Sequence, residues 1–267
     1  MAPGEPCVVA SPVMFKERFD LSGKWSLVTG ASRGIGEATA LALAEAGSDV
    51  VLCSRKKEGL EETAHRIEKL GRKALVVPAN VGVEAEVQGL TEQIKKAGVS
   101  PTILINNAAS NPSMSTVLEM PDSAWQKILD VNLTGPMRVC RDIVPLMRKA
   151  GGGAIVNVAS IGGLRPSAFL GAYGVSKAGL IFLTKVLASE LARDKIRVNC
   201  VAPGLVKTQF SKAFFDNEAI YKTAIQGIRM GRHGEPEEIA SIILTLAAPA
   251  SSFMTGEVVV VDGGAIL

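Results

Sequence analysis

Short apolar runs alternate with longer amphipathic segments along most of the chain. Runs rich in Val, Ile and Leu that are bounded by Gly, Asn or Ser are typical of strands buried in a parallel sheet. Several of the segments between them repeat their apolar residues at helical spacing. This alternation predicts one α/β domain, a doubly wound and mostly parallel sheet with helices on both faces. The seven predicted strands are 24–29, 49–53, 74–77, 102–105, 154–159, 196–201 and 257–261.

The predicted helices cover 38–46, 57–70, 125–149, 173–191 and a segment that begins at Glu235. The third of these contains Asn132, four residues before Pro136. Because proline has no N–H, the carbonyl of Asn132 loses its helical partner and is free to bind a water. The alternative is an ordinary kink with a solvent-facing Asn132.

A glycine-rich turn joins the first strand to the first helix. The residues Gly30, Ser32, Arg33, Gly34, Ile35 and Gly36 belong to it. Glycines allow the backbone to approach a pyrophosphate closely, and the N-terminus of the following helix attracts the negative charge. The turn therefore predicts a dinucleotide site at the start of the domain.

The same turn also fits the pattern Gly-x-Ser-x-Gly, the nucleophile elbow of serine hydrolases. Ser32 would then be the nucleophile, with Asp216 and His233 downstream as its acid and base. This alternative leaves the residues described next without a role.

The end of the second strand sets the preference between NAD(H) and NADP(H). A carboxylate at this place binds the ribose 2′-hydroxyl of NAD, whereas arginine binds the 2′-phosphate of NADP. The chain has Ser54 and Arg55 here, and Arg33 in the glycine turn can reach the same corner. NADP(H) is therefore favoured over NAD(H), unless Arg55 and Lys56 only begin a solvated helix.

Candidate catalytic side chains follow the fifth strand. Ser160 lies at the carboxyl end of that strand, and Tyr173 and Lys177 are one turn apart on the next predicted helix. An ammonium beside a phenol is expected to lower the pKa of the phenol, so that Tyr173 can exchange a proton with a substrate oxygen held by Ser160. A Tyr and a Lys at this spacing also occur together on helices by chance.

Ser160 and the run Tyr173-Gly174-Val175-Ser176-Lys177 resemble the active-site signature of the classical short-chain dehydrogenase/reductase family. The spacing Gly-x-x-x-Gly-x-Gly in the first turn adds to the resemblance, which covers about residues 21 to 264. It implies a Rossmann-type fold, hydride transfer without a metal, and a homotetramer or homodimer.

The resemblance also implies the role of each matching residue. Tyr173 would be the proton donor or acceptor, Ser160 would orient the substrate, Lys177 would bind the nicotinamide ribose, and Asn132 would act through a water. Further cofactor contacts would come from residues after the third, fourth and sixth strands. These are Asn80, where the family usually has Asp, and Val81, Asn107, Ala108, Pro203, Gly204, Val206 and Thr208.

Composition limits the other possibilities. A net charge of +3 with 4% aromatic residues gives no nucleic-acid footprint, and no apolar segment indicates a membrane span. The cysteines Cys7, Cys53, Cys140 and Cys200 have no metal-ligand spacing and are expected to be reduced. Residues 1–20 read as a flexible leader before a catalytic domain over 21–267, and the cytoplasm is the predicted location.

Residues 209–234 combine aromatic and polar side chains and are interpreted as a substrate lid, with a capping helix pair as the alternative. The sequence predicts reversible hydride transfer between NADP(H) and a carbonyl or secondary alcohol, as in a 3-oxoacyl reductase or a general ketone reductase. A sugar-acid dehydrogenase similar to gluconate 5-dehydrogenase is the first alternative. A non-catalytic NADP(H)-binding regulator is the second, although it would not need complete Ser, Tyr, Lys and Asn positions.

Overall fold

The computed structural model describes residues 14–111, 115–167 and 170–267. In this part of the chain one sheet is formed in the order β3-β2-β1-β4-β5-β6-β7, and every neighbouring pair is parallel. The predicted α/β, doubly wound fold is confirmed. The strands are β1 Trp25–Thr29, β2 Asp49–Ser54, β3 Ala74–Pro78, β4 Ile103–Asn106, β5 Gly153–Val158, β6 Ile196–Pro203 and β7 Val258–Val261.

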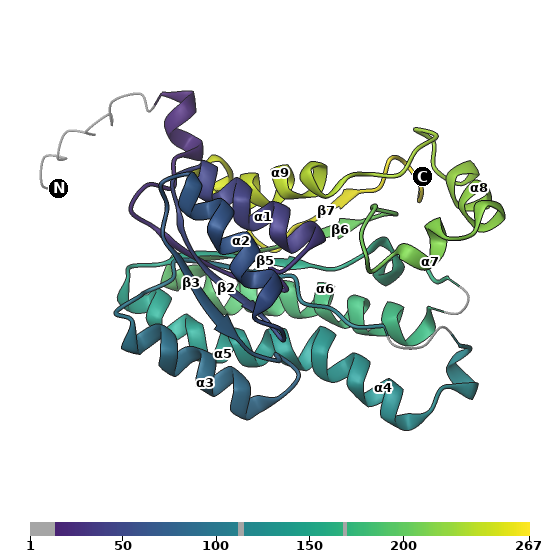
Figure 1. Cartoon of the computed structure of the whole chain (residues 1–267), viewed down its shortest axis with the longest axis horizontal. Helices are drawn as coiled ribbons and strands as arrows, with labels where there is room; N and C mark the ends of the chain where they lie inside the picture. Colours follow the sequence, from purple (N-terminus) through teal and green to yellow (C-terminus); the bar gives the residue numbers. More distant parts are fainter. Residues whose placement is uncertain (1–13, 112–114, 168–169) are drawn as a thin grey trace, which may run out of the picture.

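Helices cover both faces of the sheet, as Figure 1 shows. One layer contains α1 (Gly34–Glu45), α2 (Glu58–Lys69) and α9 (Pro236–Ala247). The other contains α3 (Glu84–Lys96), α5 (Gly135–Lys149) and α6 (Gly171–Leu191). The remaining helices are α4 (Asp122–Leu129), α7 (Lys212–Phe215) and α8 (Glu218–Gln226), of which α7 and α8 project beyond one end of the sheet in Figure 1.

The two helix layers make two hydrophobic cores because alternate residues of a strand face opposite sides of the sheet. In β1, Val28 packs into the core beneath α1, α2 and α9, whereas Leu27 packs into the core of α3, α5 and α6. Both side chains are fully buried. Complete burial of one such side chain stabilises the fold by about 1.5–3 kcal/mol.

The order of the strands places a crevice beside β1. The chain runs outward from β1 to β3 and then returns to β4, which pairs with the other side of β1. At such a reversal the loops after neighbouring strands diverge and leave a space at their carboxyl ends. The residues after β1, β4 and β5, including Gly30, Asn107 and Ser160, meet at this edge.

The long helix predicted over 125–149 is divided into α4 and α5 by a π-helical turn, η3, over Asp130–Thr134. Helix α3 has no counterpart among the predicted helices. The leader prediction falls partly outside the described residues, which begin at Met14, and Phe15–Phe19 form a 3-10 helix, η1. Cys53, Cys140 and Cys200 are buried free thiols, and Cys7 lies outside the described residues.

Within the described residues, no helix combines the length and the hydrophobicity that crossing a bilayer requires.

Candidate active site

The glycine turn after β1 has a backbone that other residues would not fit. Gly30 and Gly34 have φ values of +68° and +59°, in the left-handed region that favours glycine. A Cβ on Gly30 would lie 2.7 Å from Nδ2 of Asn107, and a Cβ on Gly36 would overlap the carbonyl oxygen of Gly30. Helix α1 begins inside the turn at Gly34, so its free N–H groups open toward the same space.

Asn107 holds the turn in place from the end of β4. Its Nδ2 donates to the carbonyl oxygens of Thr29, at 3.0 Å, and Gly30, at 3.2 Å. The backbone N–H groups of Asn107 and Ala108 both donate to Oγ1 of Thr29, at 3.0 and 3.1 Å. The sequence analysis predicted Asn107 to be a cofactor contact. In the structure its side chain hydrogen-bonds the backbone of the glycine turn.

A cavity of about 1660 Å³ extends along the carboxyl ends of the strands. Most of the predicted site residues line it. Gly36 and Asn132 do not, and both are buried beneath it. The lining residues from the prediction are Gly30, Ser32, Arg33, Gly34, Ile35, Ser54, Arg55, Asn80, Val81, Asn107, Ala108, Ser160, Tyr173, Lys177, Pro203, Gly204, Val206 and Thr208.

Ser160, Tyr173 and Lys177 come together at this cavity. Ser160 lies two residues after β5 and caps the 3-10 helix η4 (Ile161–Gly163), where its Oγ accepts the N–H of Gly162 at 3.0 Å. The hydroxyls of Ser160 and Tyr173 share a hydrogen bond. Nζ of Lys177 donates to the carbonyl oxygen of Val158 at 2.8 Å and lies 5.6 Å from the centre of the Tyr173 ring.

The pKa of Tyr173 changes in the direction opposite to the one expected from the sequence. Desolvation raises the pKa of Tyr173 to about 12, although the hydrogen bond from Ser160 opposes the change. Desolvation also lowers the pKa of Lys177 to about 8. The expectation that Lys177 lowers the pKa of Tyr173 is therefore wrong for the protein without cofactor. Desolvation of the phenol outweighs the hydrogen bond with Ser160, and the amine of Lys177 is directed to the carbonyl of Val158.

Asn132 is buried, so the alternative of a solvent-facing side chain is wrong. Its Oδ1 accepts the N–H of Ser110 at 2.8 Å, and its Nδ2 donates to the carbonyl of Ser110 and to Oγ of Ser176, both at 3.0 Å. Oγ of Ser176 in turn donates to the carbonyl of Tyr173 at 2.7 Å. Asn132 thus ties the loop after β4 to the second turn of α6.

The π-helical turn explains how Asn132 comes to this place. The N–H of Gly135 bonds to the carbonyl of Asp130, five residues back, so one extra residue fits into the turn. Gly135 is required by packing, because a Cβ there would lie 2.9 Å from the carbonyl oxygen of Val81. Pro136 follows Gly135 and has no N–H, so it cannot make the hydrogen bond that another residue would make at this place in a helix.

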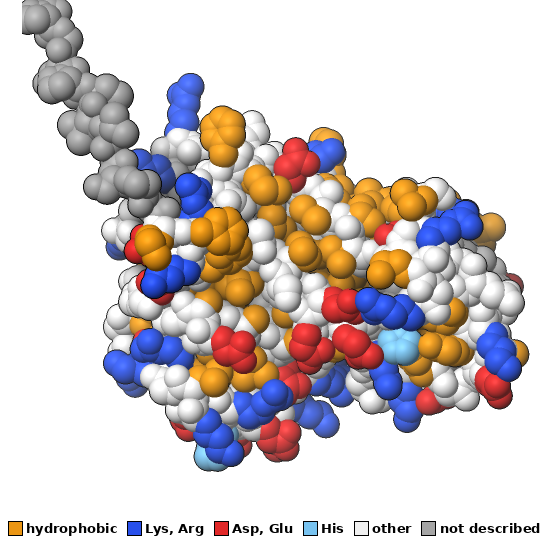
Figure 2. Space-filling model, turned by 90° about the horizontal axis from the view of Figure 1, so that it is seen from above, with side chains coloured by type: hydrophobic (Ala, Val, Ile, Leu, Met, Phe, Trp, Pro, Cys, Tyr) orange, Lys and Arg blue, Asp and Glu red, His pale blue; other side chains and the backbone are white. Residues whose placement is uncertain are grey.

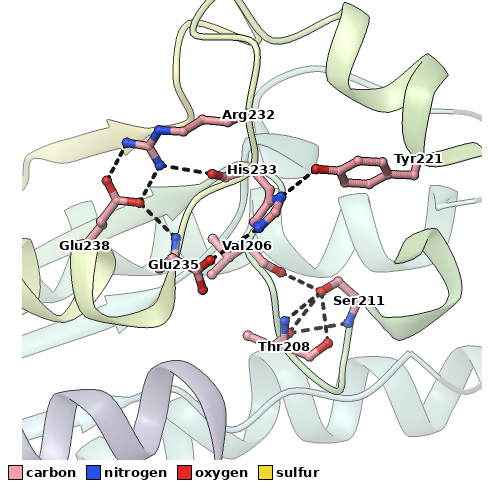
Figure 3. A network of polar contacts seen from close by, with 8 residues as sticks. All are labelled: Val206, Thr208, Ser211, Tyr221, Arg232, His233, Glu235 and Glu238. Carbon is pink, nitrogen blue, oxygen red and sulfur yellow. Dashed lines mark hydrogen bonds and ion pairs between the residues drawn. The ribbon is translucent and has the colours of Figure 1, made fainter. Parts of the chain in front are cut away.

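Phe210 covers the catalytic group from the segment after β6. The centres of the Phe210 and Tyr173 rings are 5.6 Å apart. The turn that carries Phe210 is closed by Ser211, whose Oγ donates to the carbonyl of Val206 and shares a 3.1 Å hydrogen bond with Oγ1 of Thr208 (Figure 3). Thr208 also lies against the glycine turn, since a Cβ on Gly34 would be 3.1 Å from its Cγ2.

A second polar group fastens α8 to the chain before α9. The hydroxyl of Tyr221 hydrogen-bonds Nδ1 of His233 at 2.8 Å, and Nε2 of His233 lies 3.3 Å from Oε1 of Glu235 (Figure 3). Beside them, Arg232 makes two hydrogen bonds of 2.8 and 2.7 Å to the carboxylate of Glu238. This pair lowers the pKa of Glu238 to about 2.

Comparisons with known proteins agree with this geometry. The profile of a family described as enoyl-(acyl carrier protein) reductase matches residues 30–265, nearly the whole chain. The chain is 40% identical over 248 residues to dehydrogenase/reductase SDR family member 4 of Oryctolagus cuniculus, covering 93% of this chain and 95% of that protein. The chain belongs to the short-chain dehydrogenase/reductase family.

Two further relatives of the short-chain dehydrogenase/reductase family extend the comparison. A 3-oxoacyl-acyl-carrier-protein reductase, FabG of Thermotoga maritima, is 37% identical over 247 residues, which cover 92% of this chain and 99% of that protein. The structure of L-sorbose reductase from Gluconobacter frateurii, complexed with NADPH and L-sorbose, superposes with a TM-score of 0.87. It is 33% identical and covers 93% of this chain and 98% of that chain.

As a short-chain dehydrogenase/reductase, the protein is an NAD(P)-dependent oxidoreductase, and the cavity has features that such a cofactor requires. Gly30, Gly34 and Gly36 place no side chain of their own on the backbone of the turn, which phosphates would approach. Arg33 and Arg55 line the same end of the cavity and have no ion pair or side-chain hydrogen bond within the described residues. The buried amine of Lys177 lies near the other end.

The serine hydrolase alternative is wrong. Ser32 lines the nucleotide end of the cavity, whereas both ring nitrogens of His233 are engaged by Tyr221 and Glu235. Asp216 faces Lys212 at 4.0 Å instead of His233. Sequence reasoning missed Ser110 and Ser176 as neighbours of the catalytic group. Ser176 carried a signal, since it lies within the signature between Tyr173 and Lys177, and Phe210 belongs to the segment that the sequence analysis interpreted as a lid.

Proposed function

We propose that the protein reduces a ketone to a secondary alcohol with NADPH, and that the reaction runs in both directions. The observation that carries this proposal is the meeting of Ser160, Tyr173 and Lys177 at one end of a cavity. Its other end has the glycine turn and two arginines that form no ion pair with the described residues. The bound nicotinamide supplies or accepts the hydride, and the residues of the chain handle the proton.

Tyr173 acts as the general acid in the reducing direction. Because its pKa is about 12, the phenol is almost fully protonated at neutral pH and can donate to the substrate oxygen. The hydroxyl of Ser160, already within hydrogen-bond reach of Tyr173, holds the same oxygen. When Tyr173 loses its proton, the ammonium of Lys177 stabilises the phenolate. A water bound to the backbone carbonyl of Asn132 supplies the next proton by way of Lys177.

The preference for NADP(H) rests on charge. Ser54 ends β2 without a carboxylate, and the guanidinium groups of Arg33 and Arg55 line the cavity beside it. Arginine binds a phosphate by paired hydrogen bonds. NAD has no 2′-phosphate that could accept them. Arg55 also precedes the first residue of α2, Glu58, and is therefore not part of that helix.

The substrate end of the cavity is largely apolar. Leu170, Phe210, Phe214 and Ile266 contribute to its wall, which suits an acyl chain or the carbon skeleton of a ketone. This favours a 3-oxoacyl compound or a simple ketone. FabG of Thermotoga maritima is named for the first class. The sugar-acid alternative draws on the likeness to L-sorbose reductase, which was crystallised with a sugar.

The segment 209–234 is proposed to be the substrate lid. Phe210, Phe214 and Ala224 line the cavity from this segment. On its other side Tyr221 is held by His233, and the ring of Phe215 packs edge-on against His233 with 5.1 Å between centres. A lid that opens at this contact would admit the substrate and then exclude water from Tyr173.

A homodimer or homotetramer is the proposed assembly. Val175, Phe182 and Val186 are exposed at helical spacing along one face of α6. Hydrophobic side chains also gather on the face seen in Figure 2, and near β7 the side chains of Phe253 and Val260 are exposed. Exposed apolar patches of this kind are typical of subunit contacts. The proposed location is the cytoplasm, as predicted from the sequence.

The test is consumption of NADPH, followed by its absorbance, with a panel of a 3-oxoacyl thioester, a keto sugar acid and simple ketones. Tyr173→Phe should abolish turnover and retain NADPH binding, because the ring stays and only the proton donor is lost. Wild-type turnover by this variant would refute the role of Tyr173. Tight NADPH binding without turnover of any carbonyl would favour the non-catalytic regulator.

A further inference from the structure

Three arginines line the cavity, and most of the other arginines are engaged by neighbouring residues. Arg72, for example, pairs with Asp49 at 3.1 Å, and Arg232 pairs with Glu238 at 2.7 Å. The three that line the cavity, Arg33, Arg55 and Arg165, have no ion pair or side-chain hydrogen bond within the described residues. An arginine kept free of carboxylates in a cavity is available to a negatively charged ligand.

Arg33 and Arg55 lie at the nucleotide end of the cavity, but Arg165 lies at the substrate end. It directly follows the turn that begins at Ser160, and its backbone N–H donates to the carbonyl of Ile161 at 2.9 Å. This turn packs tightly on α6, since a Cβ on Gly163 would lie 2.7 Å from the carbonyl carbon of Lys177. The backbone of Arg165 is thereby fixed with respect to the catalytic group.

The charges around the substrate end leave Arg165 without a counter-charge. Two carboxylates line the cavity among the described residues, and both lie toward the nucleotide end. Glu58 begins α2, next to the glycine turn, and the backbone of Asp130 lies beside Gly82 in the loop after β3. The lining residues that follow Arg165 in the described part of the sequence, Pro166, Ser167 and Leu170, carry no charge.

We infer that Arg165 selects substrates that carry an anionic group, a carboxylate in the simplest case, on the side of the ketone away from the nicotinamide. The inference rests on the proposed function and adds the class of substrate. The guanidinium would make charge-assisted hydrogen bonds to the carboxylate while the apolar wall holds the carbon chain between the two groups. The guanidinium of Arg165 reaches only a limited distance from its backbone. The number of carbons between the carboxylate and the ketone should therefore decide how well a substrate fits.

The experiment compares matched substrates and matched variants. The probes are 4-oxopentanoate, 5-oxohexanoate and 6-oxoheptanoate, each with its methyl ester, and the measurement is the ratio of kcat/KM for acid over ester with NADPH. The variants are Arg165→Gln, Arg165→Lys and Arg165→Glu. The control is Arg193→Gln, because Arg193 is an exposed arginine outside the cavity.

The wild type and Arg193→Gln should prefer one or more of the acids to their esters by roughly tenfold, and added salt should weaken this preference. Arg165→Gln should bring the ratio close to one, Arg165→Lys should retain part of it, and Arg165→Glu should favour the ester. A wild-type ratio near one, or a preference that survives in Arg165→Gln, would overturn the inference.

Binding of hexanoate and hexanamide, measured by calorimetry in the presence of NADPH, separates the two proposals. If no ketone is reduced but hexanoate binds more tightly than hexanamide and Arg165→Gln removes the difference, Arg165 is an anion-binding residue and the proposed reaction is wrong. If ketone esters are reduced but hexanoate binds no better than hexanamide, the reaction stands and the role of Arg165 is refuted.

Discussion

Replacing Lys177 by Met is expected to make the cofactor-free protein more stable. Lys177 is only 2% exposed, and among the described residues its amine hydrogen-bonds only the carbonyl of Val158. Methionine has a similar length and keeps the packing of the side chain, but it carries no charge. The substitution therefore removes a buried cation without opening a large cavity.

The magnitude follows from the pKa of Lys177, which burial lowers from 10.5 to about 8. A change of that size corresponds to about 3 kcal/mol by which the fold disfavours the protonated amine. Losing the hydrogen bond to the carbonyl of Val158 offsets about 1 kcal/mol of this gain. The expected net stabilisation is about 2 kcal/mol near pH 7, or roughly 4–8 °C in Tm for a chain of this size.

The pH dependence of this difference identifies its cause. Below about pH 8 the amine is protonated in the folded and the unfolded state, and the wild type carries the full penalty. Between pH 8 and 10.5 the folded protein releases the proton while the unfolded chain keeps it, so the stability of the wild type rises with pH. The advantage of Lys177→Met should accordingly shrink over this range.

Urea unfolding of both proteins without cofactor, at a series of pH values and one protein concentration, measures the difference. Lys185→Met is the matched control, because Lys185 is exposed on the same helix. The reasoning is refuted if Lys177→Met is no more stable than the wild type near neutral pH, or if its advantage stays constant with rising pH.

Three further predictions concern the cofactor and the lid. Arg55→Ala should weaken NADPH binding by roughly tenfold to a hundredfold and leave NADH binding nearly unchanged, which titration with both nucleotides would measure; an equal loss for both would contradict the charge argument. Tyr221→Phe keeps the ring but removes the 2.8 Å hydrogen bond to His233, so the KM for the ketone should rise while NADPH affinity stays the same. A change in NADPH affinity alone would speak against the lid. Gly36→Ala places a methyl group against the carbonyl of Gly30 and should destabilise the turn by several kcal/mol, seen as lost NADPH binding and a lower Tm.

The order of strands and helices could be predicted because the short apolar runs and the helical periodicities of the sequence both fit an alternating α/β fold. The apolar runs gave strands within a few residues of those observed, such as 74–77 against Ala74–Pro78. Parallel strands have their carboxyl ends on one edge, so the residues after them had to meet there. Gly30, Ser160 and Pro203 are far apart in the sequence, and this rule places them at one edge without any knowledge of side-chain contacts.

The features of the site that the sequence could not predict depend on burial and on contacts between segments that are distant in the sequence. The spacing of Tyr173 and Lys177 indicated an electrostatic interaction, but the direction of the pKa change depended on how much water surrounds the ring. For Asn132 the sequence indicated only a role of the backbone carbonyl, and the bonds of its side chain to Ser110 and Ser176 require the folded positions of three elements. The pairing of Tyr221 with His233 has no pattern in the sequence that would reveal it.

The valine run at the end of the chain has a consequence for handling the protein. Strand β7, Val258–Val261, is the outermost strand on its side of the sheet, and Val260 is 41% exposed. An apolar edge strand offers backbone groups that can template the strand of another molecule. If nothing covers this edge, the protein should be prone to turbidity and precipitation at high concentration.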